Sequence, residues 1–215
     1  MIMGEKITYS VIVPVYNEEG NVQSLYEDIV STMDKVGDSY EIVFIDDGSS
    51  DGTYAKLKKL SGVKIIRFRK NFGQTAALDA GFKNASGAFF ITMDGDGQNP
   101  PSEIPKLIKT LKEGEFDLVS GWRKNRKDTF MKRFVSRGAY RLRSFIVKDH
   151  IKDSGCSLKI YRRECFDDLD LFGEMHRFIP ALLYWKGFTI GEVEVSHKPR
   201  TSGVTKYNWK RTLKG

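Results

Sequence analysis

The sequence places two carboxylates where they could share one divalent cation. Asp94 and Asp96 stand two residues apart in the run Asp-Gly-Asp-Gly-Gln, directly after an apolar segment. Gly95 and Gly97 let the backbone turn tightly, so both carboxylates can reach one region. Hard oxygen ligands of this kind suit Mg²⁺ or Mn²⁺, which also bridges substrate phosphates. Asp-Gly turns also occur for geometry alone, so this motif by itself leaves both interpretations open.

A second acidic cluster, Asp46-Asp47-Gly-Ser-Ser50-Asp51, ends an earlier apolar segment. Its carboxylates could accept hydrogen bonds from ribose hydroxyls or from the N–H groups of a base. Ser50 or Asp51 could equally cap the helix that follows. The chain has neither a Gly-x-x-x-x-Gly-Lys-Ser/Thr loop nor Gly-x-Gly-x-x-Gly after its first apolar segment, which argues against a P-loop ATPase and a dinucleotide dehydrogenase.

The positive charge of the chain is unevenly distributed. The net charge is +7 at pH 7, and residues 123–148 are rich in lysine and arginine, with Asp128 as their one acid. This excess favours a surface that faces an anionic partner, although a solvated face stays possible. Near the end of the chain, Arg200 and Lys206 flank a glycine-containing segment that could close over a pyrophosphate or serve as a solvated linker.

Apolar segments typical of strands alternate with segments of helical periodicity, which favours an α/β fold with a mostly parallel sheet. We expect strands at 7–15, 40–45, 63–68, 88–93 and 117–119, with helices at 22–36, 53–60, 73–84 and 101–113. Ligands bind such sheets at the carboxyl ends of the strands, which is where both acidic clusters fall. After residue 121 the pattern changes, and we expect strands at 157–161 and 188–195 and a helix at 175–185.

These elements predict a single domain over residues 1–215, with a nucleotide-binding half over about 1–121 and an acceptor-binding half over about 122–215. No apolar run approaches the roughly 18 residues that a membrane-spanning helix needs. Cys156 and Cys165 match no metal or redox spacing, so we expect two reduced cysteines that pack in the interior.

Taken in order, four motifs resemble the family 2 glycosyltransferases of the GT-A fold, with a Rossmann-like, mostly parallel central sheet flanked by helices. The motifs are Val11–Glu18, Asp46–Asp51, Asn71–Gln74 with Ala80-Gly81, and Asp94–Pro101. Four later motifs look like the polyprenyl- and dolichyl-phosphate glycosyltransferases, such as the dolichol-phosphate mannose synthases. They are Arg123–Asp128, Asp153–Cys156, His176–Pro180 and Arg200–Tyr207. Two positions depart from the pattern, since Thr205 stands where Ser is usual and Gly97 where Leu is usual.

The resemblance implies a metal-dependent, inverting transfer of a hexose from a nucleotide diphosphate sugar to a polyprenyl or dolichyl phosphate. UDP-glucose is the favoured donor and GDP-mannose the next. In such relatives the domain precedes a membrane-attached C-terminal region, so we expect this chain to be truncated before one. The partners are then the nucleotide sugar, the lipid phosphate and the membrane surface, with the protein on its cytoplasmic face. Oligomeric state is left open.

The resemblance also assigns roles by motif position. The Mn²⁺ or Mg²⁺ ligands would be Asp94, Asp96 and Gln98. The nucleotide-sugar contacts would be Pro14, Tyr16, Glu18, Asp46, Asp47, Asp94, Gly95, Asp96, Arg200 and Lys206. The acceptor phosphate would meet Arg123, Lys132, Arg133 and Ser136. The catalytic residues would be Asp94, Asp96, Asp153 and Arg123, with Asp153 orienting the donor sugar.

Three other functions stay open at this point. A family 2 glycosyltransferase that builds a polysaccharide or glycosylates a protein would share the first half but use a hydroxyl acceptor and need a general base. A phosphate acceptor is already ionised and needs positioning and charge screening instead, which fits the basic segment. The charge alone would also fit a nucleic-acid binder, but no base-reading module is present and we expect no nucleic-acid partner. A nucleotide-sugar-binding pseudoenzyme would be distinguished by turnover.

Overall fold

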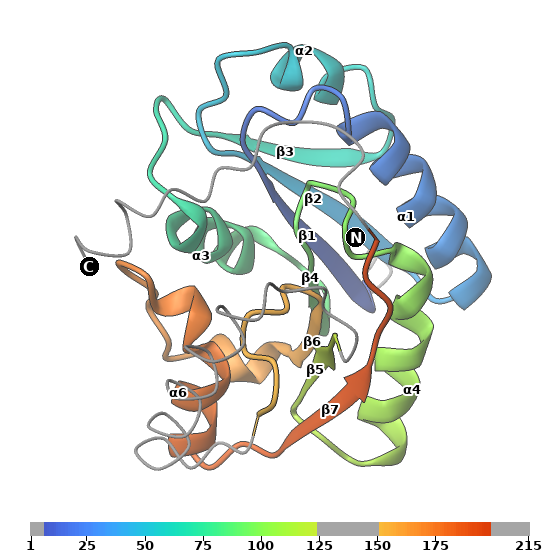
Figure 1. The fold of residues 1–215 in the computed structure, drawn as a ribbon, viewed down its shortest axis with the longest axis vertical. Coiled ribbons are helices and arrows are strands. Elements are labelled where there is room, and N and C mark those ends of the chain that lie inside the picture. The colour runs from blue at the N-terminus through green and yellow to red at the C-terminus, as the bar shows by residue number, and fades with distance from the viewer. Residues whose placement is uncertain (1–6, 124–150, 199–215) are drawn as a thin grey trace, which may run out of the picture.

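In the part of the chain that the structure describes, seven strands form one sheet in the order β3-β2-β1-β4-β6-β5-β7 (Figure 1). The structure is a computed structural model and describes residues 7–123 and 151–198. The strands are β1 (Tyr9–Val15), β2 (Tyr40–Asp46), β3 (Val63–Arg67), β4 (Phe89–Thr92), β5 (Leu118–Trp122), β6 (Lys159–Arg162) and β7 (Ile190–Glu194). The predicted strands are all present, with ends that differ by at most three residues.

Helices cover both faces of the sheet. The α-helices are α1 (Val22–Val36), α2 (Thr53–Leu57), α3 (Gln74–Asn84), α4 (Ile104–Glu113) and α6 (Ile179–Trp185). Short 3-10 helices are η1 (Pro101–Glu103), η2 (Arg163–Phe166) and η3 (Met175–Arg177). Figure 1 shows α1 and α4 against one face, and α3 and α6 against the other. The α/β architecture predicted from the sequence is therefore confirmed.

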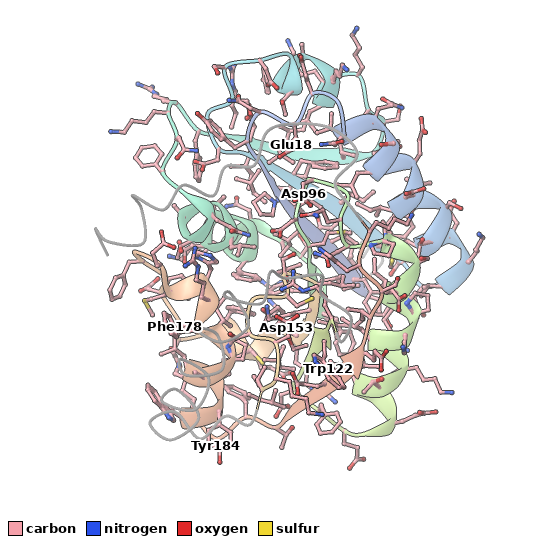
Figure 2. All side chains as sticks on the ribbon, in the orientation of Figure 1. Glu18, Asp96, Trp122, Asp153, Phe178 and Tyr184 are labelled. Atoms are coloured by element: carbon pink, nitrogen blue, oxygen red, sulfur yellow. The ribbon has the colours of Figure 1, made fainter. Side chains whose placement is uncertain are left out.

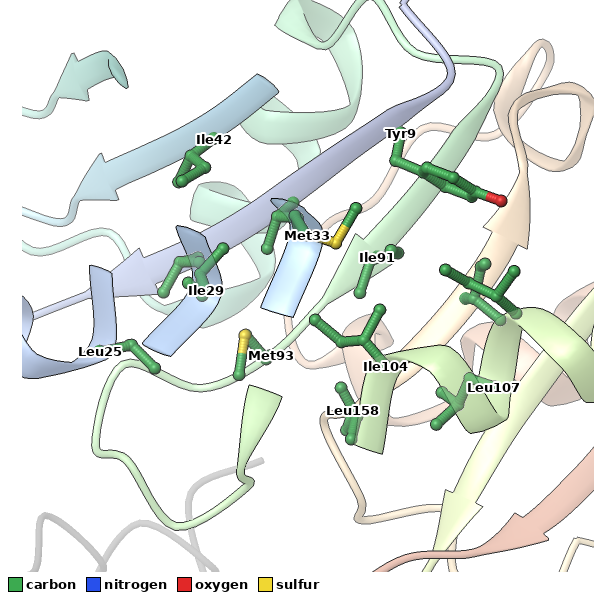
Figure 3. Close-up of a cluster of buried hydrophobic side chains, with 14 of the residues drawn as sticks. Tyr9, Leu25, Ile29, Met33, Ile42, Ile91, Met93, Ile104, Leu107 and Leu158 are labelled. Atoms are coloured by element: carbon green, nitrogen blue, oxygen red, sulfur yellow. The ribbon is translucent and has the colours of Figure 1, made fainter. Parts of the chain in front are cut away.

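Alternating side chains of the central strands supply two cores, one on each face. On β1, Val11 and Val13 join the core under α1 and α4, whereas Ile12 joins the core under α3. Phe44 and Ile45 of β2 divide in the same way. The close-up in Figure 3 shows the first core, where residues of α1, β4 and α4 meet. Burial on both faces explains why these strands have near-continuous apolar sequences.

The strand directions bring the polar ends of several strands to one edge. β1 pairs in parallel with β2 and β4, and β2 with β3. β6 runs antiparallel to both β4 and β5, so it is inserted between them in the opposite direction. The segment before β6 therefore lies at the same edge as the ends of β4 and β5. Sequence periodicity does not indicate this reversal.

Within residues 7–123 and 151–198, no helix is long and apolar enough to cross a membrane. Cys156 and Cys165 are both free and buried, as predicted. Burial raises the pKa of each thiol, which keeps both thiols protonated and unreactive.

Candidate active site

The polar segments after β1, β2 and β4 meet at the carboxyl edge of the sheet. Figure 2 shows Glu18 and Asp96 over the ends of β1 and β2, and Asp153 displaced toward β5 and β6. Gly95 packs directly on the end of β1, because a Cβ atom added there would lie 2.6 Å from Val15 Cγ1 and 3.1 Å from the Pro14 carbonyl oxygen. The acidic loop after β4 is thus held against the end of β1.

Asp46, the last residue of β2, presents a buried carboxylate oxygen at this edge. Its side chain has no solvent exposure, and its Oδ1 accepts a hydrogen bond of 2.9 Å from the Ser49 amide. Its Oδ2 accepts no hydrogen bond from the described residues, and Arg67 Nε lies 3.4 Å from it. Buried acceptors are normally satisfied, so this oxygen fits an N–H or O–H group of a ligand.

Asp47 organises the loop that leads into α3. Its Oδ1 accepts a hydrogen bond of 2.7 Å from the Phe72 amide, and its Oδ2 accepts bonds of 2.9 Å from the Gly73 amide and from Asn71 Nδ2. The sequence predicts a ligand contact here. The geometry adds a second function, because the same carboxylate fixes residues 71–73 beside the site.

Gly48 is required by two independent features of the same turn. Its φ angle is +71°, and an added Cβ would lie 2.4 Å from the Lys70 carbonyl carbon. Gly62 has a similar φ of +66° with nothing within 4 Å of the added Cβ. A comparison of substitutions at the two positions therefore distinguishes the cost of backbone strain from the cost of steric contact.

We expect Gly62→Ala to lower the free energy of unfolding by about 1 kcal/mol, the cost of a left-handed conformation. Gly48→Ala should cost roughly 2–4 kcal/mol, because main-chain atoms of Lys70 must also move. Urea denaturation of the two variants measures the difference. Equal losses would contradict a steric role for the contact with Lys70.

Glu18 is buried at the start of the turn that leads into α1. Its amide donates to Thr53 Oγ1 at 2.8 Å, and its Oε2 accepts from Asn21 Nδ2 at 2.6 Å. Asn17 has a left-handed φ of 52° and accepts a bond of 2.8 Å from the Ser50 amide. These bonds join the loops after β1 and β2, next to the partly buried Pro14 and Tyr16.

Asp96 lies close enough to Asp94 to affect the ionisation of Asp94. The pKa of Asp94 is raised, first by burial and then by the negative charge of Asp96. Gln74 Nε2 donates to Asp94 Oδ1 at 2.7 Å, and the backbone N–H of Gln98 donates to Asp96 Oδ1 at 3.1 Å. Two neighbouring carboxylates in a low-dielectric site favour a cation between them.

The residues present fit a divalent metal that is shared with a substrate. The described residues contain no group of three or more His, Cys, Asp or Glu side chains that could form a protein-only cage. Mg²⁺ is commonly held by one or two carboxylates together with substrate phosphates and water. Asp94 and Asp96 supply such a pair, and the side chain of Gln98 follows on the same loop.

Arg123 and Asp153 form a bidentate ion pair beside the acidic loop. Arg123 Nε donates to Asp153 Oδ2 at 2.7 Å, and Nη2 donates to Oδ1 at 2.9 Å. The side chains are only 9% and 12% exposed. Two of the four predicted catalytic residues are therefore brought together, and part of the guanidinium of Arg123 is already bonded to protein.

Ser157 connects this pair to the acidic loop. Its hydroxyl oxygen accepts bonds from the Asp94 amide at 3.1 Å and from Asn99 Nδ2 at 2.8 Å. Its carbonyl oxygen accepts a bond of 2.8 Å from the Thr92 hydroxyl. The turn at residues 153–157 thus holds Asp153 at one end and the acidic loop at the other.

Four polar residues at the site were not singled out by the sequence. Gln74, Ser157, Lys159 and His176 lie in segments whose composition gives no sign of a common location. Gln74 and His176 each lie in a motif that carries the family resemblance, which is the signal that could have drawn attention to them. By contrast, Lys132, Arg133, Ser136, Arg200 and Lys206 lie outside the described residues, so their predicted roles stay predictions.

His176 packs against the start of α3, where its Nδ1 lies 2.6 Å from the Thr75 hydroxyl. Burial, with smaller effects of Arg177 and Lys159, lowers its pKa to about 4, and Glu174 opposes this. The pKa of a histidine in an unfolded chain is about 6.5. Between about pH 4 and about pH 6.5, the two pKa values, the unfolded chain therefore binds more protons than the folded chain.

We therefore expect the free energy of unfolding to fall as the pH drops from about 6.5 toward about 4. His176→Gln should remove this contribution and flatten the dependence over the same range. Urea denaturation of both proteins across this range measures the effect. Parallel curves for the wild type and the variant would contradict it.

Comparison with known proteins identifies the family. Residues 10–170 match the model of glycosyl transferase family 2. Dodecaprenyl-phosphate galacturonate synthase of Rhizobium johnstonii is 41% identical over 98% of this chain and 64% of its own length. Undecaprenyl-phosphate 4-deoxy-4-formamido-L-arabinose transferase of Aeromonas hydrophila is 36% identical over 92% of this chain and 62% of its own length. The chain thus spans less than two thirds of these curated relatives.

Among solved structures, glucosyl-3-phosphoglycerate synthase of Mycobacterium tuberculosis in complex with Mn²⁺ and UDP-glucose superimposes with a TM-score of 0.70. The identity is 20%, and the match covers 92% of this chain and 73% of that one. The same synthase has also been solved with Mg²⁺ and UDP. This likeness confirms the predicted GT-A fold. On its sequence and its fold, the chain belongs to glycosyl transferase family 2.

Proposed function

We propose that this chain carries the catalytic domain of a glycosyltransferase that moves a sugar from a nucleotide diphosphate sugar to a polyprenyl phosphate. The observation that carries the proposal is its 41% identity, across 98% of its length, to a dodecaprenyl-phosphate galacturonate synthase. The arrangement of the site supports it, because a pair of carboxylates suited to a metal diphosphate lies close to a buried arginine. The activity of the whole protein is part of the proposal.

In this proposal the first half of the chain binds the donor. The buried Oδ2 of Asp46 accepts a hydrogen bond from the nucleoside, and Glu18 lies at the same edge of the sheet. Pro14 and Tyr16 line the nucleoside pocket, and Asp47 shapes the adjoining loop. Arg200 and Lys206 contact the diphosphate.

Asp94, Asp96 and Gln98 would hold Mn²⁺ or Mg²⁺. The metal would supply positive charge that stabilises the departing nucleoside diphosphate. Gln74 keeps one oxygen of Asp94 in place through its side-chain hydrogen bond, and the backbone N–H of Gln98 does the same for Asp96. Fixed carboxylates of this kind need little reorganisation when charge develops on the substrate.

The second half would receive the lipid phosphate. A phosphate monoester is largely ionised near neutral pH, so the reaction depends more on positioning than on a strong general base. Arg123, with Lys132, Arg133 and Ser136, would grip this phosphate. Asp153 would hold Arg123 and orient the donor sugar. Because the acceptor is a lipid, the domain would work at a membrane surface, on the cytoplasmic side.

The identity of the transferred sugar is the most specific part of the proposal. UDP-glucose is the donor that the sequence motifs favour, with GDP-mannose next. The names of the two relatives mention galacturonate and a formamido-arabinose instead. Galacturonate therefore belongs in the same donor panel.

A two-step experiment tests the proposal. Thermal unfolding with UDP-, GDP- and dTDP-sugars, with and without Mn²⁺, identifies the donor, because a ligand that binds only the folded state raises the melting temperature. Transfer from that donor is then measured onto a short-chain polyprenyl phosphate and, separately, onto the unphosphorylated polyprenol, a free sugar and a peptide. We expect product with the polyprenyl phosphate acceptor and none with the other three acceptors. Product with a hydroxyl acceptor and none with the phosphate would replace this function with polysaccharide or protein glycosylation.

A further inference from the structure

Lys159 places a buried ammonium group in the middle of the sheet. The residue is 4% exposed and begins β6, where it pairs with Thr92 of β4 on one side and Ser120 of β5 on the other. β4 leads to the acidic loop at residues 94–99, which the proposed function makes the metal loop, and β5 leads to Arg123. A buried ammonium is costly unless polar groups solvate it, so its retention at this point needs a reason.

The partners of the ammonium lie in the turn at residues 153–157. Lys159 Nζ donates to the carbonyl oxygen of Cys156 and, at 3.4 Å, to that of Ser154. Two carbonyl oxygens from one short turn therefore converge on a single cation. This contact ties the turn to the start of β6.

The same turn carries the connections to both parts of the site. At its start, Asp153 accepts the bidentate bonds from Arg123. At its end, Ser157 accepts bonds from the Asp94 amide and from Asn99. A shift of the turn would move Arg123 and the metal loop relative to each other.

The charge of the ammonium also matches its surroundings. Burial, the largest effect, lowers the pKa of Lys159, and the positive charge of Arg123 acts in the same direction. Cys156 and the carboxylates of Asp153 and Asp94 oppose this and favour the protonated form. Asp94 in turn is favoured in its ionised form by Lys159. The nitrogen of Lys159 therefore lies beneath a site that concentrates negative charge.

We propose that Lys159 is a positioning residue for sugar transfer, whose ammonium braces the turn at residues 153–157 so that Arg123 and the metal loop keep one relative geometry. This inference rests on the proposed function for its kinetic consequence. Its structural consequence, the bracing of the turn, is independent of any substrate.

Lys159→Met is the first test, because it keeps an unbranched side chain only one atom shorter and removes both the charge and the donors. We expect the variant to fold, since an apolar side chain avoids the cost of a buried charge. Hydrogen exchange should become about tenfold faster in peptides that contain the amides of Asp94 and Arg123, which the turn holds, and stay unchanged in β1. In transfer assays, kcat should fall by about 100-fold while the donor KM changes by less than about threefold.

Two further variants show whether the effect is specific to the ammonium. Lys159→Arg retains the charge and the donors and should recover most of the kcat. Ile160→Val creates a small cavity beside the same strand. It should lower the free energy of unfolding with little change in kcat, because the turn stays braced. If Lys159→Met does not fold, the comparison of Lys159→Arg with Lys159→Gln replaces it.

The proposal is overturned if Lys159→Met keeps the wild-type kcat, if Ile160→Val lowers kcat as much, or if the arginine and glutamine variants are equally slow. Unchanged hydrogen exchange at Asp94 and Arg123 would overturn it as well. Failure of the wild type to transfer sugar to any polyprenyl phosphate would instead reject the proposed function. The exchange measurement would then still decide whether Lys159 positions the turn.

Discussion

Asp96→Ala is expected to abolish metal-dependent donor binding and to lower kcat by about 1,000-fold, while the fold survives. The carboxylate of Asp96 is 8% exposed and lies close enough to Asp94 to raise the pKa of Asp94. Removing one of two neighbouring negative charges relieves their repulsion in the free protein. The melting temperature without ligand should therefore stay close to that of the wild type, because loss of the hydrogen bond from the Gln98 backbone N–H offsets this relief.

Calorimetry with Mn²⁺ and the nucleotide measures the loss of binding, and thermal unfolding measures the fold. Asp28→Ala removes an exposed carboxylate on α1, outside the site, and serves as the matched control for the change in net charge. Unchanged metal and nucleotide affinity in Asp96→Ala would remove the metal assignment. It would also remove the mechanism proposed for the departing diphosphate.

Arg123→Ala is expected to have the largest effect on stability, with a loss of about 3–5 kcal/mol in the free energy of unfolding. The reason is that Asp153 would lose its bidentate ion pair while its carboxylate stays largely buried. Asp153→Ala should cost a similar amount, and the double variant should cost less than the sum of the two. Denaturant unfolding of the four proteins gives the coupling energy.

The surface pair Lys109–Glu113 is the matched control, since its two side chains are 71% and 68% exposed. Its coupling energy should lie below about 1 kcal/mol. In the kinetic assay, Arg123→Ala should weaken the use of lipid phosphate far more than nucleotide binding. Equal losses in both would remove the acceptor role of Arg123 and leave it a structural residue.

The sequence by itself determined the architecture of the first half. Apolar strands separated by amphipathic helices can bury their side chains only in a layered α/β sheet, and parallel strands place their carboxyl ends together. The positions of Asp46, Asp94 and Asp96 follow from that rule. Gly48 was part of a predicted motif, although its contact with Lys70 depends on the tertiary structure.

The tertiary structure decided how the second half completes the site. Periodicity carries no information about strand direction, yet the antiparallel insertion of β6 brings the turn at residues 153–157 to the acidic loop at residues 94–99. The pairing of Arg123 with Asp153 spans 30 residues, and the contact between His176 and Thr75 spans 101. Lys159 stands in an otherwise apolar run, where charge alone would predict exposure. Such contacts depend on which segments the sheet brings together, and local sequence carries no record of that.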